Sequence, residues 1–199
     1  MNHLDATARA QRLMERALEL GALRYGDFTL SSGAKSSYYF DGRLLTTDGE
    51  SVEIVSSIFL KVLENRNIHR FGGPAVAAVP IIGGIALMAH TNGYDIKGYF
   101  VRSEQKQHGM GKQIEGHITP GDRVAIWDDT ISTGGSLLEA VDAVAELPAK
   151  VDVALCLLDR NQGGSDKLRE RGIPLFNILS SNSEGRVEVD TVTLSEWFD

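Results

Sequence analysis

Cysteine is almost absent from this chain of 199 residues. Cys156 stands alone, so neither an intrachain disulfide nor a metal site built from several cysteines can form. Its neighbours on both sides are apolar, which favours an inert thiol buried in a strand.

Long hydrophobic runs are also missing. The longest uncharged stretch, residues 71–89, is interrupted by Pro74, Pro80 and several glycines, so it is not typical of a membrane helix. The N-terminus lacks the contiguous apolar core of a secretory signal. We therefore expect no membrane partner and a cytoplasmic location.

Positive charge is in deficit, with 20 Lys and Arg against 27 Asp and Glu and a net charge of −7. This balance argues against a nucleic-acid partner bound through broad phosphate neutralisation, although a local basic patch would still suit a small anion. The 42% hydrophobic and 24% charged content is ordinary for a globular protein. The length favours a single domain, residues 1–199, with a sizeable core.

Strands and helices are expected to alternate along most of the chain. Asp5 is the expected cap of a first helix, and Thr193 and Glu196 have the spacing of a capping box near the end. Two extended pieces around a turn form a predicted flap at residues 28–43. Helices are predicted at 47–65, 81–90, 136–147 and 165–171, and strands at 71–73, 98–101, 123–127, 151–158 and 175–179.

Several of these strands are uniformly apolar, as in sheets covered on both faces. The pattern predicts an α/β protein with a doubly wound, mainly parallel sheet. Residues 1–45 fall outside the alternation and are predicted to form an N-terminal helix and a flap that caps the core as a hood.

The chain is organised around residues 124–136, where an apolar run ends in Asp128 and Asp129 and a Ser/Thr/Gly turn leads into a helix. Ligands bind at the carboxyl ends of parallel strands, and helix N-termini hold phosphate. Phosphate would be repelled by the two carboxylates, whereas ribose hydroxyls or a magnesium ion would be attracted. The stretch therefore predicts a site for a phosphorylated sugar, although taken alone it also fits a structural strand–helix turn.

A basic segment follows the predicted strand at 98–101. It contains Arg102, Lys106, His108 and Lys112 against one acid, Glu104. Two glycines and the lack of apolar periodicity predict a loop. Such a loop would suit a multiply charged anion, but an ordinary solvated loop explains the segment equally well when it is considered alone.

The order of these elements resembles the type I phosphoribosyltransferases, in which the acidic pair and the turn bind phosphoribosyl pyrophosphate (PRPP). Within that group the chain looks most like the orotate phosphoribosyltransferases. Four segments carry the resemblance: residues 28–33 with 38–41, Gly73-Pro74 with Val79-Pro80, residues 101–109, and residues 158–164.

The resemblance implies transfer of a 5-phosphoribosyl group from PRPP to orotate, a step of pyrimidine (UMP) synthesis. It further implies a Mg²⁺ cofactor carried by PRPP rather than by dedicated ligands, and a homodimer whose subunits share active sites. The implied catalytic residues are Lys106, His108, Asp128 and Asp129. The implied PRPP-binding residues are Arg102, Lys106, His108, Asp128, Asp129, Thr130, Ile131, Ser132, Thr133, Gly134, Gly135 and Ser136.

Orotate is expected to contact Tyr39, Phe40, Ser132 and Arg160. Arginine offers paired donors to a carboxylate, which suits Arg160 to that role. The three consecutive aromatic residues Tyr38, Tyr39 and Phe40 leave two interpretations open: one of their faces packs in a core, or Tyr39 or Phe40 lies against a flat ring.

Three lysines of well-known relatives are replaced here, by Ser31, Ala77 and Ser103. Ser103 matters most, because it removes a charge from the loop that faces pyrophosphate. One lost charge-assisted contact costs about 1.5–3 kcal/mol of binding. A phosphoribosyltransferase for another base, such as a purine, and a non-catalytic PRPP sensor are the alternatives.

Overall fold

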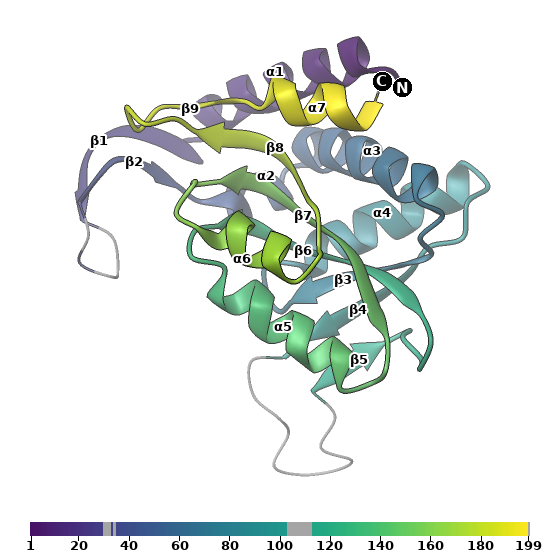
Figure 1. Cartoon of the computed structure of the whole chain (residues 1–199). Helices are drawn as coiled ribbons and strands as arrows, with labels where there is room; N and C mark the ends of the chain where they lie inside the picture. The colour runs from purple at the N-terminus through teal and green to yellow at the C-terminus, as the bar shows by residue number, and fades with distance from the viewer. Residues whose placement is uncertain (30–32, 34, 103–112, 199) are drawn as a thin grey trace.

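The computed structural model describes residues 1–29, 33, 35–102 and 113–198. A seven-stranded sheet forms the middle of three layers (Figure 1). Its order is β5 (Ile114–Gly116), β4 (Lys97–Val101), β3 (Arg70–Pro74), β6 (Arg123–Ile131), β7 (Lys150–Asp159), β8 (Leu175–Ser181) and β9 (Val187–Val189). The five inner strands, β4, β3, β6, β7 and β8, are parallel. The edge strands β5 and β9 pair antiparallel with β4 and β8.

Helices cover both faces of this sheet, because alternate residues of its strands enter separate cores. In β6, Ala125 and Trp127 belong to one core, and Val124 and Ile126 belong to the other. The first core packs under α1 (His3–Glu19), α3 (Gly49–Asn65), α4 (Val79–Thr91) and α7 (Thr191–Phe198). The second lies under α5 (Gly135–Ala145) and α6 (Gly164–Glu170). The predicted doubly wound, mainly parallel sheet is confirmed.

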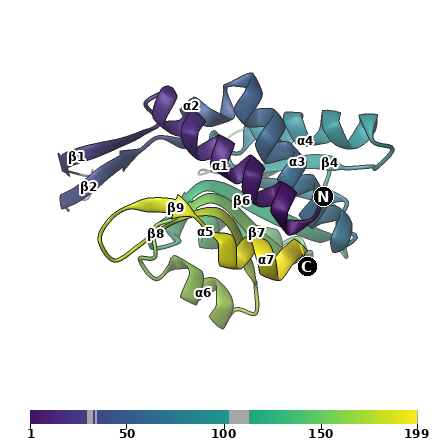
Figure 2. The same ribbon diagram turned by 90° about the horizontal axis from the view of Figure 1, so that it is seen from above.

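A separate hairpin projects from this body (Figure 2). It consists of β1 (Leu23–Thr29) and β2 (Lys35–Phe40), and β2 leads directly into the short helix α2 (Gly42–Thr46). The side chain of Asp41 accepts the backbone N–H of Arg43 and so caps α2. Helix α1 packs against α3 and α7. Among the described N-terminal residues, the end of β2 and the start of α2 reach the site described below.

Several local predictions were wrong. Strand β6 does not end at Trp127 but continues to Ile131, because Thr130 and Ile131 still pair with β7. Helix α1 is capped by Asn2, and Asp5 completes the capping box from inside the helix. Asp190, rather than Thr193, accepts the N–H at the start of α7. The short elements α2, β5 and β9 were missed, since three to five residues carry too little periodicity.

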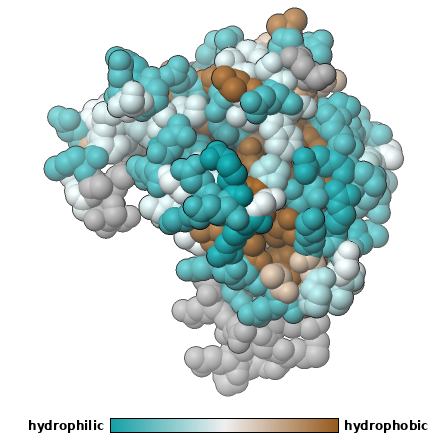
Figure 3. Space-filling view, in the orientation of Figure 1, coloured by the Kyte–Doolittle hydropathy of each residue, from teal (hydrophilic) through white to brown (hydrophobic). Residues whose placement is uncertain are grey.

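The thiol of Cys156 is fully buried in β7, as predicted. Burial raises its pKa well above the ordinary value, which keeps it protonated and unreactive. None of the described helices is long and apolar enough to cross a membrane. The face that carries α5 and α6 is largely hydrophilic, with smaller apolar patches between the helices (Figure 3).

Candidate active site

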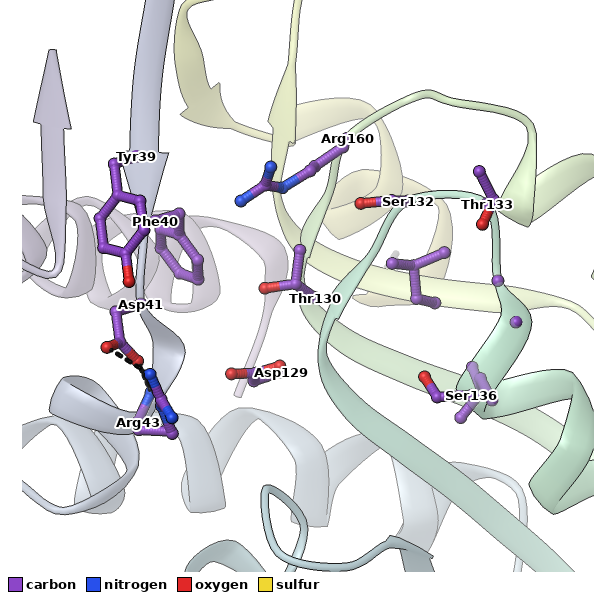
Figure 4. Close-up of a pocket in the computed structure, with 14 residues that line it drawn as sticks. Tyr39, Phe40, Asp41, Arg43, Asp129, Thr130, Ser132, Thr133, Ser136 and Arg160 are labelled. Atoms are coloured by element: carbon purple, nitrogen blue, oxygen red, sulfur yellow. Dashed lines mark hydrogen bonds and ion pairs between the residues drawn. The ribbon is translucent and has the colours of Figure 1, made fainter. Parts of the chain in front are cut away.

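A pocket of about 450 Å³ opens at the carboxyl ends of β6 and β7 (Figure 4). The end of β2 and the start of α2 form the opposite wall, which we call the hood (residues 39–43). This is the edge where parallel sheets bind ligands. The lining residues are Tyr39, Phe40, Asp41, Arg43, Asp129, Thr130, Ile131, Ser132, Thr133, Gly134, Gly135, Ser136, Leu137 and Arg160.

Asp128 lies behind the pocket wall and is only 7% exposed. Its carboxylate accepts the hydroxyl of Ser136 at 2.8 Å and the backbone N–H of Asp129 at 3.0 Å. Burial, together with the neighbouring charge of Asp129, raises the pKa of Asp128 to about 6. The carboxylate therefore ties the strand to the first turn of α5 and fixes the turn between them.

Asp129 faces the pocket itself (Figure 4). Burial and the carboxylate of Asp41 raise its pKa, while the cations Arg43 and Arg160 oppose the shift. Asp41 is itself paired with Arg43 at 2.8 Å, which holds the pKa of Asp41 below its ordinary value. The wall of the pocket thus presents one carboxylate whose charge is only partly compensated, ready to accept hydrogen bonds from hydroxyl donors.

The turn after β6 leads into an uncapped helix N-terminus. Gly134 adopts a left-handed conformation as the N-cap of α5, with no capping side chain. The first backbone N–H groups of α5 are therefore free of side-chain caps and line the pocket. Gly164 supports the turn from behind, since its N–H donates to Ser132 O at 2.9 Å, and Lys167 Nζ donates to Thr133 O at 3.0 Å.

Arg160 follows the last residue of β7 and extends toward the hood (Figure 4). Phe40 is buried at 6% exposure within the first core and also lines the pocket. Tyr39 lines the pocket too, with Arg24 stacked over its ring at 5.1 Å. The structure thus brings Tyr39, Phe40 and Arg160 to one end of the pocket and the anion-binding turn to the other.

Other predicted residues lie elsewhere. Arg102 sits at the end of β4 and pairs with Glu115 at 3.4 Å, and it is not among the described residues that line the pocket. Lys106 and His108, together with Ser31 and Ser103, lie outside the described residues.

Three lining residues, Asp41, Arg43 and Leu137, were not predicted as site residues. The signal for Asp41 and Arg43 was their position just after the aromatic residues Tyr39 and Phe40, and Leu137 directly follows the predicted turn.

The fold and the pocket together define a type I phosphoribosyltransferase: a doubly wound sheet with an acidic pair and an anion-binding turn at its carboxyl edge. No protein-family model matches the chain, but its sequence is similar to those of known phosphoribosyltransferases. The chain is 39% identical over 174 residues to the orotate phosphoribosyltransferase of Rhodopirellula baltica, covering 84% of this chain and 90% of that protein. It is 36% identical over 172 residues to the Methanopyrus kandleri protein of the same name, covering 86% and 90%.

Solved structures give the same result. The orotate phosphoribosyltransferase of Mycobacterium tuberculosis superposes with a TM-score of 0.74 at 30% identity, covering 86% of this chain and 95% of that one. Its complex with PRPP superposes with a TM-score of 0.70 at 28% identity and the same coverage. The chain belongs to the orotate phosphoribosyltransferase family.

Proposed function

We propose that this chain transfers the 5-phosphoribosyl group from PRPP to orotate, giving orotidine 5-monophosphate and pyrophosphate in the synthesis of UMP. One observation carries the proposal. A single pocket joins an uncapped helix N-terminus and the carboxylate of Asp129 at one end to an arginine and two aromatic rings at the other. That arrangement matches a donor with a phosphate and a ribose, next to a flat base that bears a carboxylate.

The donor would occupy the end of the pocket formed by β6 and α5. Asp129 would accept hydrogen bonds from the ribose hydroxyls. Asp128 would support it from behind through the hydrogen bonds to the Asp129 N–H and the Ser136 hydroxyl. The turn from Thr130 to Ser136 would hold the 5-phosphate through its N–H groups and hydroxyls. Repulsion between the Asp129 carboxylate and phosphate would favour the ribose, rather than either phosphorylated end of the donor, beside Asp129.

The base would occupy the other end. Arg160 would receive the orotate carboxylate, Tyr39 and Phe40 would lie against the ring, and Ser132 would contact its edge. The ring nitrogen attacks C1 of the ribose as the bond to pyrophosphate breaks. The ribose gains positive charge in this step. The partly buried carboxylate of Asp129 would stabilise that charge, most strongly where solvent is excluded.

Pyrophosphate would leave toward Arg102, Lys106 and His108, which act by charge, one of them with a further proton-transfer role. The described residues contain no cluster of three His, Cys, Asp or Glu side chains that would hold a metal by themselves. Mg²⁺ would be bound mainly through PRPP oxygens, and the ion would neutralise charge on the diphosphate. A cytoplasmic location belongs to the same proposal.

A homodimer with shared sites is also proposed, and the outer face of α4 supports it. This helix is apolar almost all round but buries only Ile81, Ile85 and Ala89. Val76 before it is 79% exposed, and Val79 and Leu87 are 44% and 68% exposed. Exposed apolar residues grouped in this way are typical of interaction surfaces.

A steady-state assay of orotate consumption with PRPP and magnesium tests the function. Turnover of orotate, and thermal stabilisation by orotidine 5-monophosphate but not by purine nucleotides, are expected. Retained PRPP binding without turnover would instead favour a non-catalytic sensor, and stabilisation by a purine nucleotide would favour another base.

Mixing two inactive variants, Lys106→Ala and Arg160→Ala, tests the shared site. Hybrid dimers should recover part of the activity, because each would retain one complete site. Proven subunit exchange without recovery would exclude sharing.

A further inference from the structure

Tyr38 is a buried aromatic residue that the proposed reaction does not use. Along β2 it alternates with Tyr39, so Tyr38 and Phe40 share the buried face while Tyr39 lies on the other. Its side chain is 5% exposed, and the guanidinium carbon of Arg160 lies over its ring at 5.3 Å from the centroid. A cation at this position over a ring is attracted by its π electrons, most strongly where water is excluded.

The main chain of Arg160 is fixed independently of this contact. Its N–H donates to Ile131 O at 2.8 Å, and its carbonyl accepts the hydroxyl of Ser181 at 2.9 Å. These two hydrogen bonds fix the main chain of Arg160 but do not by themselves fix its side-chain torsions. The Arg160 guanidinium lies over the Tyr38 ring, and this contact restricts where the guanidinium can lie.

The guanidinium also has unused capacity to donate. Arg160 Nε is buried and has no hydrogen-bond partner among the described residues. An unpaired buried donor is costly. Arg160 lines the pocket, so a ligand carboxylate would approach the remaining donors of its guanidinium from there.

We propose that Tyr38 is a positioning residue for base recognition: its ring holds the Arg160 guanidinium in the orientation that receives the carboxylate of the base. The inference rests on the proposed function, because it assigns Arg160 to that carboxylate. Tyr38 touches no substrate. It lowers the cost of ordering a long side chain when the base binds, since the guanidinium is already in place.

The substitution Tyr38→Met tests this, because it keeps an apolar side chain of similar reach but removes the ring face. KM for orotate should rise about 3- to 30-fold, the range expected for a lost cation–π contact. KM for PRPP should stay unchanged, since the donor end of the pocket does not contact Tyr38. Tyr38→Phe keeps the ring and should restore the wild-type KM for orotate.

Tyr25→Met is the matched control. Tyr25 is the cross-strand partner of Tyr38 in the same hairpin, and it also has an arginine, Arg186, over its ring at 5.8 Å. It does not line the pocket among the described residues. Its replacement should leave both KM values unchanged, whereas a rise in KM for orotate would show that any loss in the hairpin suffices and would overturn the proposal. Equal rises in both KM values for Tyr38→Met would also overturn it.

An NMR measurement on the free protein separates this inference from the proposed function. The Nε–H resonance of Arg160, assigned with Arg160→Lys, should be shifted by the ring current in the wild type and in Tyr38→Phe. An unshifted resonance in the wild type overturns the positioning role, whether or not Tyr38→Met folds. Failure to turn over orotate, with the ring-current shift present, would reject the proposed function while leaving the contact intact.

Discussion

Gly42 lies directly against the carboxylate of Asp129. A Cβ placed on residue 42 would stand 2.6 Å from both Cβ and Oδ2 of Asp129, closer than real Cβ contacts allow. The first residue of α2, within the hood, is therefore in contact with the side chain that we assign to the ribose. Any side chain at this position must displace either α2 or Asp129.

We therefore expect Gly42→Ala to raise KM for PRPP and to lower turnover, because the carboxylate is pushed away from the ribose. Overpacking of this kind costs about 1–3 kcal/mol of stability, measurable as a lower melting temperature. Gly49→Ala is the matched control, since a Cβ there meets nothing within 4 Å. Wild-type kinetics in Gly42→Ala would mean that the hood moves freely relative to Asp129.

Asp129→Asn should lower turnover by at least one order of magnitude while leaving the protein folded. The charge that stabilises the developing sugar cation is lost, and electrostatic groups of this kind contribute about 2.7–4 kcal/mol to catalysis. Stability should not fall, because burial already disfavours the charged form of Asp129. Asp95→Asn, at an exposed carboxylate, is the control for general charge effects. Unchanged turnover in Asp129→Asn would show that the ribose lies elsewhere.

Asp128 should make stability depend on pH. Its pKa is raised from 3.8 to about 6, so between these values the folded protein retains a proton that the unfolded chain has released. The free energy of unfolding therefore falls as pH rises through this window, by about 3 kcal/mol at most, and stays lower above it.

In Asp128→Asn this loss should disappear, because the amide has no charge to bury and the Ser136 hydroxyl can accept its N–H. The difference in melting temperature, variant minus wild type, should therefore increase as the pH is raised from about 3.8 to above 6. A constant difference across the window would show that Asp128 keeps an ordinary pKa.

Leu87→Glu should weaken self-association if the outer face of α4 joins two copies of the chain. A carboxylate at this exposed apolar position would be buried without a partner in the dimer. Light scattering over a range of concentrations measures the effect. Val192→Glu, at a similarly exposed residue on α7, should leave the assembly unchanged. Dissociation in both variants, or in neither, would argue against α4 as the interface.

The acidic pair and its turn were predicted from the sequence because they are local. An apolar run followed by two aspartates and a Ser/Thr/Gly turn before an amphipathic helix is typical of the carboxyl edge of a sheet. The boundary of β6 was wrong, since pairing with β7 extends the strand through Asp129 to Ile131. Tertiary hydrogen bonds overrode the local signal there.

The sequence by itself determined the alternation of elements, and hence the doubly wound sheet, the buried Cys156 and the family. It could not determine which aromatic of the run faces which partner, because an extended strand offers both faces equally. Only the tertiary structure placed Tyr38 under Arg160 and Gly42 against Asp129. These contacts join residues that are more than eighty positions apart, and no local pattern records which distant side chain fills a given space.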